Sequence, residues 1–201
     1  MVTTPPFNRL VLASHNQGKI AELATMLAPF GVHVLSAYDL DLPEVAEDRD
    51  TFSGNAAKKA QEICAATNLP TLADDSGLCV DALGGAPGVL TARYSRTYER
   101  LMIEIAHIPP AQRGAHFVCV LAFALPDGTL KTFEGRADGH IHTTPLGEGG
   151  FGYDPVFIPL GETRTFAQMT ADEKKAHSHR GKATKLFLDY LENFTSLALK
   201  A

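Results

Sequence analysis

Two adjacent aspartates follow an apolar run, and they constrain the fold more than any other feature of the sequence. Residues 70–73 predict a short strand that ends at Asp74 and Asp75, and Gly77 then allows a sharp turn before a glycine-rich segment. Two neighbouring carboxylates repel one another and lose hydration on burial, so a strand end that carries both favours a cation or a shared proton. Ligands bind at the carboxyl ends of strands in open α/β sheets. On its own, this stretch is equally compatible with a solvated turn.

The composition limits the classes of protein to which the chain can belong. It has 201 residues, of which 45% are hydrophobic and 20% charged, as in ordinary soluble globular proteins. The net charge of -5 argues against nucleic acid as a partner, since nucleic acid favours a basic face. The three scattered cysteines suit free thiols in a reducing compartment. Because the sequence shows neither a secretory signal nor an apolar run that could span a bilayer, we expect a cytoplasmic protein with no membrane partner.

A strand-to-helix turn near the N-terminus has the composition of a phosphate-binding site. Residues 9–14 predict a buried strand, and a helix is predicted from Asn16 onward, because apolar residues recur at helical spacing from Ile20. The turn between them contains small polar residues, Gly18 and Lys19, and backbone N–H groups at a helix N-terminus can hold a phosphate together with a lysine. It is not a Walker loop, because Ile20 follows the lysine and Ala13 replaces the leading glycine. A plain helix cap with a surface lysine is the alternative that this segment alone favours.

An acidic loop over residues 41–50 precedes a helix that we predict over residues 52–67. Capping and the helix dipole explain most of this charge, although one or two of the carboxylates can face a cation. Asn55 and Lys59 lie four residues apart on the predicted helix, so an amide and an ammonium project in the same direction. A lysine on a helix is usually solvated, and Lys59 gains interest only from its surroundings.

The middle of the chain is rich in strands. Residues 116–125 are apolar on both alternating faces, which predicts a central strand that is covered on both sides. Residues 126–129 predict a hairpin turn, and an antiparallel strand follows to about Glu134. His140 and His142 alternate on one side of a strand-like segment, but no further ligand is near in sequence and we do not expect zinc there. The order of the elements indicates one α/β domain with a mixed sheet.

A glycine-rich loop over residues 147–155 and a basic segment after it are the remaining informative stretches. The loop contains a G-x-G-x-x-G match, but Tyr153 and its neighbours follow where a dinucleotide site needs a helix. Exposed aromatics beside a carboxylate suit stacking on a flat ring and hydrogen bonding to its edge. A loop whose Phe151 and Tyr153 side chains are buried in the core is equally compatible with this segment. Lys174, His179 and Arg180 precede a closing helix that we predict over residues 182–199, and together they would attract an anion or carbonyl oxygens. The alternative is a solvated basic helix start.

Seven short motifs along the chain carry a resemblance to a known family. They occur in one order: Ser14-x-Asn16-x-x-Lys19, Thr51-Phe52-x-x-Asn55-Ala56, Ala73-Asp-Asp-Ser-Gly-Leu78, Gly84-Gly-Ala-Pro-Gly88, Ala92-Arg-Tyr-Ser95, Gly149-Gly-Phe-Gly-Tyr-Asp-Pro155 and Ser178-His-Arg180. Together they resemble the inosine triphosphate pyrophosphatase family, the Ham1/RdgB-like pyrophosphatases of non-standard purine nucleoside triphosphates. The resemblance spans nearly the whole chain, from about Leu10 to Leu191.

The resemblance implies a fold and an activity. The fold would be α/β, with an elongated mixed β-sheet flanked by helices and two lobes around a central cleft, as one domain over residues 1–201. The activity would be hydrolysis of dITP, ITP and XTP to the nucleoside monophosphate and pyrophosphate with Mg2+, which cleanses the nucleotide pool. The resemblance also implies a homodimer. Donors that face O6 of hypoxanthine or xanthine would reject the adenine amino group.

The resemblance also assigns roles to particular residues. Asp75 would be the general base and a metal ligand. A second metal ligand would be Glu47 by register, or Glu44 if the loop shifts. The residues that would contact the substrate are Ser14, His15, Asn16, Gln17, Gly18, Lys19, Lys59, Ser76, Phe151, Gly152, Tyr153, Asp154, Lys174, His179 and Arg180.

Three positions depart from the family's usual pattern. Ala46 stands in a run that is usually Glu-Glu-Thr-Gly-x-Thr-Phe, Gly54 stands where an acid often precedes Asn55, and His15 replaces a common glycine. Two other classes of protein remain open. A phosphatase with an aspartyl nucleophile typically needs a second aspartate two positions on, which neither Asp74 nor its neighbour has. A nucleotide-binding protein without catalysis would bind purine nucleotides but release no pyrophosphate.

Overall fold

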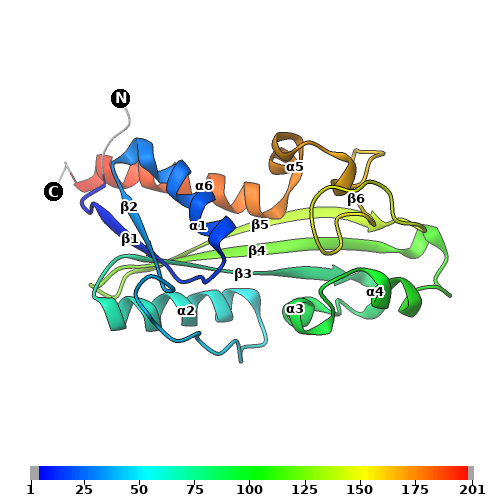
Figure 1. Cartoon of the computed structure of the whole chain (residues 1–201), viewed down its shortest axis with the longest axis horizontal. Helices are drawn as coiled ribbons and strands as arrows, with labels where there is room; N and C mark the ends of the chain where they lie inside the picture. Colours follow the sequence, from blue (N-terminus) through cyan, green and yellow to red (C-terminus); the bar gives the residue numbers. More distant parts are fainter. Residues whose placement is uncertain (1–4, 199–201) are drawn as a thin grey trace. The chain divides into compact units, whose positions relative to one another are not determined.

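The structure is a computed structural model, and it describes residues 5–198 of the chain (Figure 1). Within these residues six strands form one sheet in the order β2-β1-β3-β4-β5-β6. The strands are β1 (Arg9–Leu12), β2 (His33–Ser36), β3 (Thr71–Val80), β4 (Gly114–Ala124), β5 (Leu130–Ile141) and β6 (Phe157–Pro159). Strand β1 pairs in parallel with β2 and β3, whereas β5 and β6 are antiparallel. The sheet is therefore mixed, as the sequence predicted.

The helices flank this sheet. They are α1 (Gln17–Leu27), α2 (Phe52–Thr67), α3 (Thr91–Tyr94), α4 (Glu99–Glu104), α5 (Ala171–His177) and α6 (His179–Ala198). Figure 1 shows α1 and α2 on opposite sides of β3. Helix α2 has the predicted bounds because its ends carry local signals: the Thr51 side chain accepts a hydrogen bond from the Gly54 N–H, and Asn68 takes the left-handed conformation.

Strand β3 is longer than the sequence predicted, and the prediction of a short strand that ends at Asp74 is wrong. The strand continues through Asp75 and Gly77 to Val80, so both aspartates lie in its middle and Gly77 makes no turn. The first glycine after the aspartates that has a positive φ is Gly84. The strand continues because the residues that follow the aspartates, such as Leu78, are as buried as those before them.

The predictions for the next two strands are partly confirmed. Strand β4 is buried along almost its whole length, as predicted for a central strand. The hairpin turn is present, with the Leu125 N–H donating to the Thr129 carbonyl at 2.9 Å. Strand β5 continues beyond the predicted end at Glu134, because Gly135 and Ala137 keep one of its faces buried.

Contacts divide the chain into two compact units. Unit 1 comprises the residues up to Asp75, Val120–Phe133 and the residues from Thr184 onward, and unit 2 comprises Ser76–Cys119 and Glu134–Ala183. Aromatic contacts mark the core of unit 1, where the Phe123 ring lies 5.5 Å from the Phe187 ring. The core of unit 2 gathers these residues among others: Leu78, Leu101, Phe117, Ile141, Tyr153, Phe157 and Phe166. Each unit thus buries an apolar cluster of its own.

Helix α6 follows α5 directly, and the junction between them lies in unit 2. The closing helix begins at His179, three residues before the predicted start, after a break at Ser178. A β-carbon at Gly181 would lie 1.9 Å from the carbonyl oxygen of Lys175, so only glycine fits this junction. The Gly181 N–H donates to the Ser178 hydroxyl at 3.0 Å, which caps the first turn of α6.

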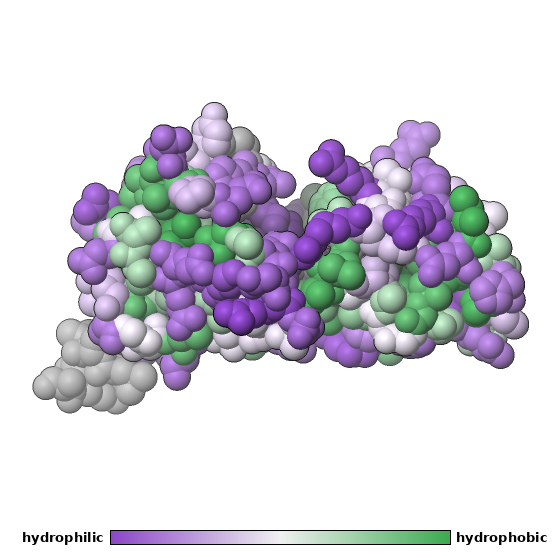
Figure 2. Space-filling view, turned by 90° about the horizontal axis from the view of Figure 1, so that it is seen from below, coloured by the Kyte–Doolittle hydropathy of each residue, from purple (hydrophilic) through white to green (hydrophobic). Residues whose placement is uncertain are grey.

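Figure 2 shows one face of the molecule, on which hydrophobic patches lie among hydrophilic residues. No helix in the described residues 5–198 is long and apolar enough to span a membrane.

Candidate functional site

The two aspartates of β3 have different partners on different helices. The Lys19 ammonium of α1 donates to Oδ2 of Asp74 at 2.7 Å, and the Asn55 amide of α2 donates to Oδ2 of Asp75 at 2.9 Å. Successive side chains of a strand point to opposite faces, and α1 and α2 lie on opposite sides of β3. The two carboxylates therefore face apart, and the cation or shared proton that the sequence favours for them stays a prediction. Each has its own partner because the strand continues through them.

The strand-to-helix turn before α1 is closed by its own side chains. The Asn16 side chain accepts a hydrogen bond from the Lys19 N–H at 3.1 Å, and the Ser14 hydroxyl accepts one from the Asn16 N–H at 3.1 Å. Gly18 lies in the first turn beside this cap, and Gln17 begins the helix with a side chain outside the described part. The helix cap of the alternative interpretation is present, and phosphate binding by this turn stays a prediction. Lys19, however, is bound to a buried carboxylate and is not a plain surface lysine.

His15 lies in the same turn and contacts the acidic loop. Its Nε2 is 3.2 Å from the carbonyl oxygen of Leu42, and its Nδ1 is 3.8 Å from Glu44 Oε1. The Glu44 side chain is 85% exposed. The position at which the sequence departs from the common glycine thus places an imidazole beside this loop.

Helix α2 projects an amide and an ammonium toward the same stretch of β3, as the spacing of Asn55 and Lys59 predicted. The Lys59 ammonium donates to Glu47 Oε1 at 2.8 Å and to the carbonyl oxygen of Asp74 at 2.5 Å. One turn earlier, Asn55 is fully buried and contacts Asp75. The neighbouring Lys58 instead binds Asp48, and this hydrogen bond lowers the pKa of the Asp48 carboxyl.

Glu47 and Asp75 are oxygen donors of the kind that Mg2+ prefers. Glu47 shares Lys59 with the backbone of Asp74, which places the Glu47 carboxylate beside the aspartate pair, whereas Glu44 contacts His15. Within residues 5–198 no group of three or more His, Cys, Asp or Glu side chains is arranged to hold a metal. Mg2+ commonly takes one or two carboxylates and completes its shell with phosphate oxygens and waters. Two carboxylates without a protein cage therefore fit that ion.

In unit 2 the glycine-rich loop separates its two aromatic residues. Phe151 is 71% exposed, whereas Tyr153 is 4% exposed and its hydroxyl donates to the carbonyl oxygen of Ser95 at 3.1 Å. Burial raises the pKa of Tyr153 to about 12. Of the two interpretations left open for this loop, exposure holds for Phe151, and burial in the core holds for Tyr153, whose ring belongs to the apolar core of unit 2.

Asp154 organises the polar side of this loop. Its Oδ2 accepts hydrogen bonds from the Lys174 ammonium at 2.6 Å and from the Phe151 N–H at 2.7 Å. The Lys174 ammonium lies 4.7 Å from the centre of the Phe151 ring. A β-carbon at Gly150 would lie 2.0 Å from Asp154 Oδ2, so this carboxylate position needs glycine there. The loop thus presents a cation and an exposed ring side by side.

Four further predicted residues belong to unit 2: His179, Arg180, Gly152 and Ser76. His179 stacks on Phe117 of β4 with ring centres 4.7 Å apart, and Phe117 in turn contacts the Phe166 ring, over which Lys174 lies. Arg180 follows His179 in the first turn of α6, and both are partly buried. Gly152 lies in the loop at positive φ, and Ser76 is a partly buried residue of β3.

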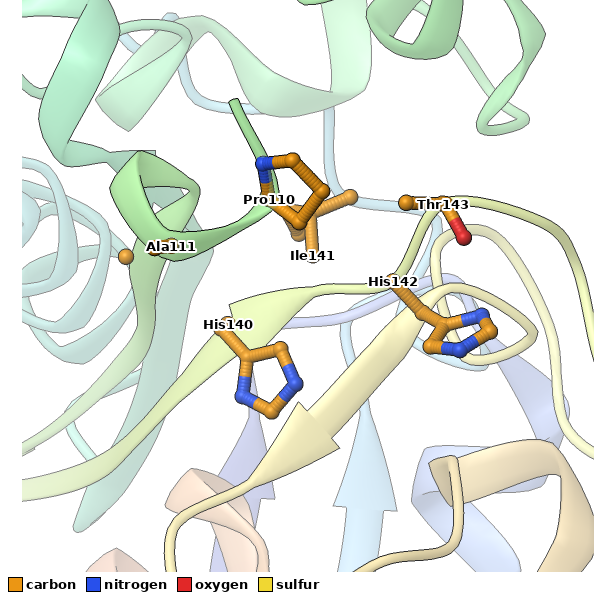
Figure 3. A pocket seen from close by; sticks show the side chains of 7 residues that line it. Pro110, Ala111, His140, Ile141, His142 and Thr143 are labelled. Carbon is orange, nitrogen blue, oxygen red and sulfur yellow. The ribbon is translucent and has the colours of Figure 1, made fainter. Parts of the chain in front are cut away.

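A separate pocket of about 550 Å3 lies in unit 2 and contains none of these residues (Figure 3). Figure 3 shows the His140 and His142 rings on one side of the strand and Ile141 on the other, toward Pro110. The His142 Nδ1 is 2.8 Å from the carbonyl oxygen of Thr144.

Two site residues were missed by sequence reasoning. Asp74 and Asn55 were not assigned to the substrate or the metal, yet they bind Lys19 and Asp75. The spacing of Asn55 and Lys59 was the available signal for one of them. For Asp74 the signal was its position next to Asp75. Because the strand was predicted to end at these residues, their side chains were not expected to point to opposite faces of β3.

Solved structures of the same fold define the class of protein. The chain is similar to the Ham1 protein of Staphylococcus aureus, with a TM-score of 0.83 and 35% identity over 92% of this chain and 98% of that one. It is similarly related to a HAM1 protein from Coxiella burnetii, with a TM-score of 0.83 and 33% identity over 97% and 100% of the two chains.

The sequence comparisons agree with the structural ones. The pattern of the Ham1 family matches residues 10–190, and the chain therefore belongs to the Ham1 family. A protein of Streptomyces avermitilis named dITP/XTP pyrophosphatase is 51% identical over 87% of this chain and 92% of its own length. A Yersinia pestis protein of the same name is 44% identical over 92% and 98% of the two chains.

Proposed function

We propose that this protein is a nucleoside triphosphate pyrophosphatase that acts on the non-standard purine nucleotides dITP, ITP and XTP. One observation carries the proposal. Lys19 and Lys59, from two different helices, both reach the segment of β3 that carries Asp74 and Asp75. Two ammonium groups beside two carboxylates suit a reaction that binds phosphates and activates water. Membership of the Ham1 family and the names of the relatives support the substrate class.

Asp75 is the general base in this proposal. An ionised carboxylate that is held by the Asn55 amide can accept a proton from a water directed at phosphorus. Lys19 and Lys59 bind phosphate oxygens, and pyrophosphate leaves as a charged group that these ammoniums stabilise. Asp75 and Glu47 hold Mg2+, whose contribution when bound is to neutralise charge on the phosphate oxygens. We favour Glu47 over Glu44 because the Glu47 carboxylate accepts a hydrogen bond from Lys59, which also binds the backbone of Asp74.

The purine base is recognised by the residues gathered in unit 2. The exposed Phe151 ring can stack on a base, and the Lys174 ammonium beside it can donate to O6 of hypoxanthine or xanthine. His179 and Arg180 supply further donors to the base and ribose. Adenine has an amino group where hypoxanthine and xanthine have O6, so this amino group would face the hydrogen-bond donors of the protein without an acceptor. Such a mismatch can reduce kcat/KM for ATP by a factor on the order of 10⁴. The Tyr153 ring is buried and takes no part in stacking.

The products of ITP hydrolysis test the proposed bond cleavage. Incubation with ITP and Mg2+ should give IMP and pyrophosphate in equal amounts, as separated by ion-exchange chromatography, and omission of Mg2+ should stop the reaction. IDP and phosphate as products would mean that another bond is cleaved. Nucleotide binding without any product would favour a protein that binds nucleotides without catalysis.

We further propose that the protein is a homodimer in the cytoplasm. Ile103 and Leu160 are 78% and 79% exposed, and a subunit contact would cover such large apolar side chains. Light scattering on a size-exclusion column should then give a mass of twice 21.6 kDa. A mass of 21.6 kDa at micromolar concentration would contradict the dimer. Cell fractionation tests the compartment.

A further inference from the structure

Asn55 uses both ends of its side-chain amide while fully buried. Its Nδ2 donates to Oδ2 of Asp75 at 2.9 Å, and its Oδ1 accepts a hydrogen bond from the Arg49 N–H at 2.9 Å. One side chain therefore links the loop before α2 to the middle of β3. This is not a helix cap, because the Thr51 hydroxyl already accepts the hydrogen bond from the Gly54 N–H at the start of α2.

Lys59 makes a second link of the same kind one turn further along α2. Its ammonium binds Glu47 of the loop and the carbonyl oxygen of Asp74 in β3. Lys59 thus links Glu47 of the loop to Asp74 of the strand, and Asn55 links Arg49 of the loop to Asp75 of the strand. Helix α2 thereby fixes the distance between the loop and the strand at two adjacent points.

The two ends of the Asn55 link carry the groups that the proposed chemistry uses. Asp75 accepts one amide hydrogen bond directly, and Glu47 lies two residues before Arg49 in the loop. A carboxylate that is 7% exposed and held by a buried amide has a restricted orientation. Hydrogen-bond partners of metal-binding carboxylates orient them, and their loss weakens metal binding or activity by roughly 10- to 100-fold.

We propose that Asn55 is a positioning residue that orients the Asp75 carboxylate and sets the loop of Glu47 against it. The inference rests on the proposed function, since it concerns how that site is held together. Asn55 itself contacts neither substrate nor metal in this account. Its effect is exerted through Asp75 and through the backbone of Arg49.

The test compares Asn55→Ala with Ile63→Ala, a matched cavity-forming variant in the same helix. Ile63 is also buried, two turns further along α2, and is in none of the contacts described for the site. The measurements are thermal unfolding, the affinity of the nucleotide-free protein for Mn2+ by electron paramagnetic resonance, and kcat and KM for ITP. Mn2+ is used as the probe because it takes the same oxygen ligands as Mg2+.

The two variants should differ in their Mn2+ affinity and in kcat. Asn55→Ala should weaken Mn2+ binding by roughly 10- to 100-fold and lower kcat by a similar factor, with KM for ITP changed by less than about threefold. Ile63→Ala should lose at least as much thermal stability while its Mn2+ affinity and kcat stay within about twofold. Equal effects of both variants on Mn2+ affinity, or wild-type affinity in Asn55→Ala, would overturn the proposal.

A second variant covers the case in which Asn55→Ala does not fold. Asn55→Asp keeps an acceptor for the Arg49 N–H but replaces the donor to Asp75 with a carboxylate, and it should show the same loss. If the wild-type protein binds Mn2+ but releases no pyrophosphate, the proposed function fails and the Mn2+ comparison still decides the role of Asn55. If the wild-type protein does not bind Mn2+, the inference itself is overturned.

Discussion

Asp75 is the residue on which the proposed chemistry depends most. Replacement by asparagine keeps the size of the side chain and removes the proton acceptor. Asp75→Asn should therefore lower kcat for ITP by about 10²- to 10⁴-fold, the range that a general base contributes. Circular dichroism should show an unchanged fold. Asp138→Asn is the matched control, because Asp138 is an exposed carboxylate that pairs with Arg136, and its activity should stay within about twofold. Turnover that is unchanged in Asp75→Asn would remove Asp75 from the mechanism.

Tyr153 and Tyr94 predict how stability depends on pH at the alkaline end. Burial raises the pKa of each to about 12, and for Tyr94 the hydrogen bond to Glu104 adds to the effect. A free tyrosine has a pKa of about 10. The folded protein thus favours the protonated form, so this stabilisation is complete below about pH 10 and is lost as the pH rises from 10 to 12.

Absorbance at 295 nm measures this ionisation directly. Two tyrosines should ionise with midpoints near pH 12, and Tyr153→Phe should remove one of them. The same variant should lose about 1 kcal/mol of stability at neutral pH, since the hydroxyl no longer binds Ser95. A single midpoint near pH 10 for all five tyrosines would contradict the burial of these two rings.

Single residues were predictable where a local rule applied and unpredictable where packing decides. The spacing of Asn55 and Lys59 fixes their common direction on a helix, and the structure confirms it. The exposure of Phe151 and the burial of Tyr153 depend on the apolar core of unit 2, which comes from segments far apart in the sequence. Local sequence cannot distinguish these two rings.

Whole helices and strands were likewise predictable where local signals mark their ends and not where packing decides. Helix α2 was predicted with its correct bounds because Thr51 and Asn68 mark its ends. The ends of β3 and β5 were predicted wrongly because neighbouring strands and helices decide where a strand stops. Lys19 and Asn55 supply partners for Asp74 and Asp75, so the carboxylates do not end β3.

The junction of α5 and α6 gives a prediction for an element. Gly181→Ala would place a β-carbon 1.9 Å from the Lys175 carbonyl oxygen, and the helices would have to move apart. The free energy of unfolding in urea should fall by about 1–3 kcal/mol, the usual cost of overpacking. Lys185→Ala, at an exposed position of the same helix, should change it by less than about 0.5 kcal/mol. Equal stability of the two variants would contradict the close approach of α5 and α6.

For the whole molecule, the sequence predicted the class of fold better than the arrangement of the site. The mixed sheet and the family followed from seven motifs in order, and the comparisons confirm both. The pairing of Lys19 with Asp74 and of Lys59 with Glu47 did not follow, because it joins segments that are distant in the chain. The departure at Ala46 is compatible with a metal site, since Glu47 takes the place beside the aspartates.

The central claim is selective hydrolysis of non-standard purine nucleotides, and pyrophosphate release from ITP, XTP, ATP and GTP tests it most directly. The four nucleotides should be assayed in parallel at one enzyme concentration, with and without Mg2+. We predict release from ITP and XTP that needs Mg2+, with ATP and GTP nearly inert. Equal release from all four nucleotides, or release from none, would contradict the claim.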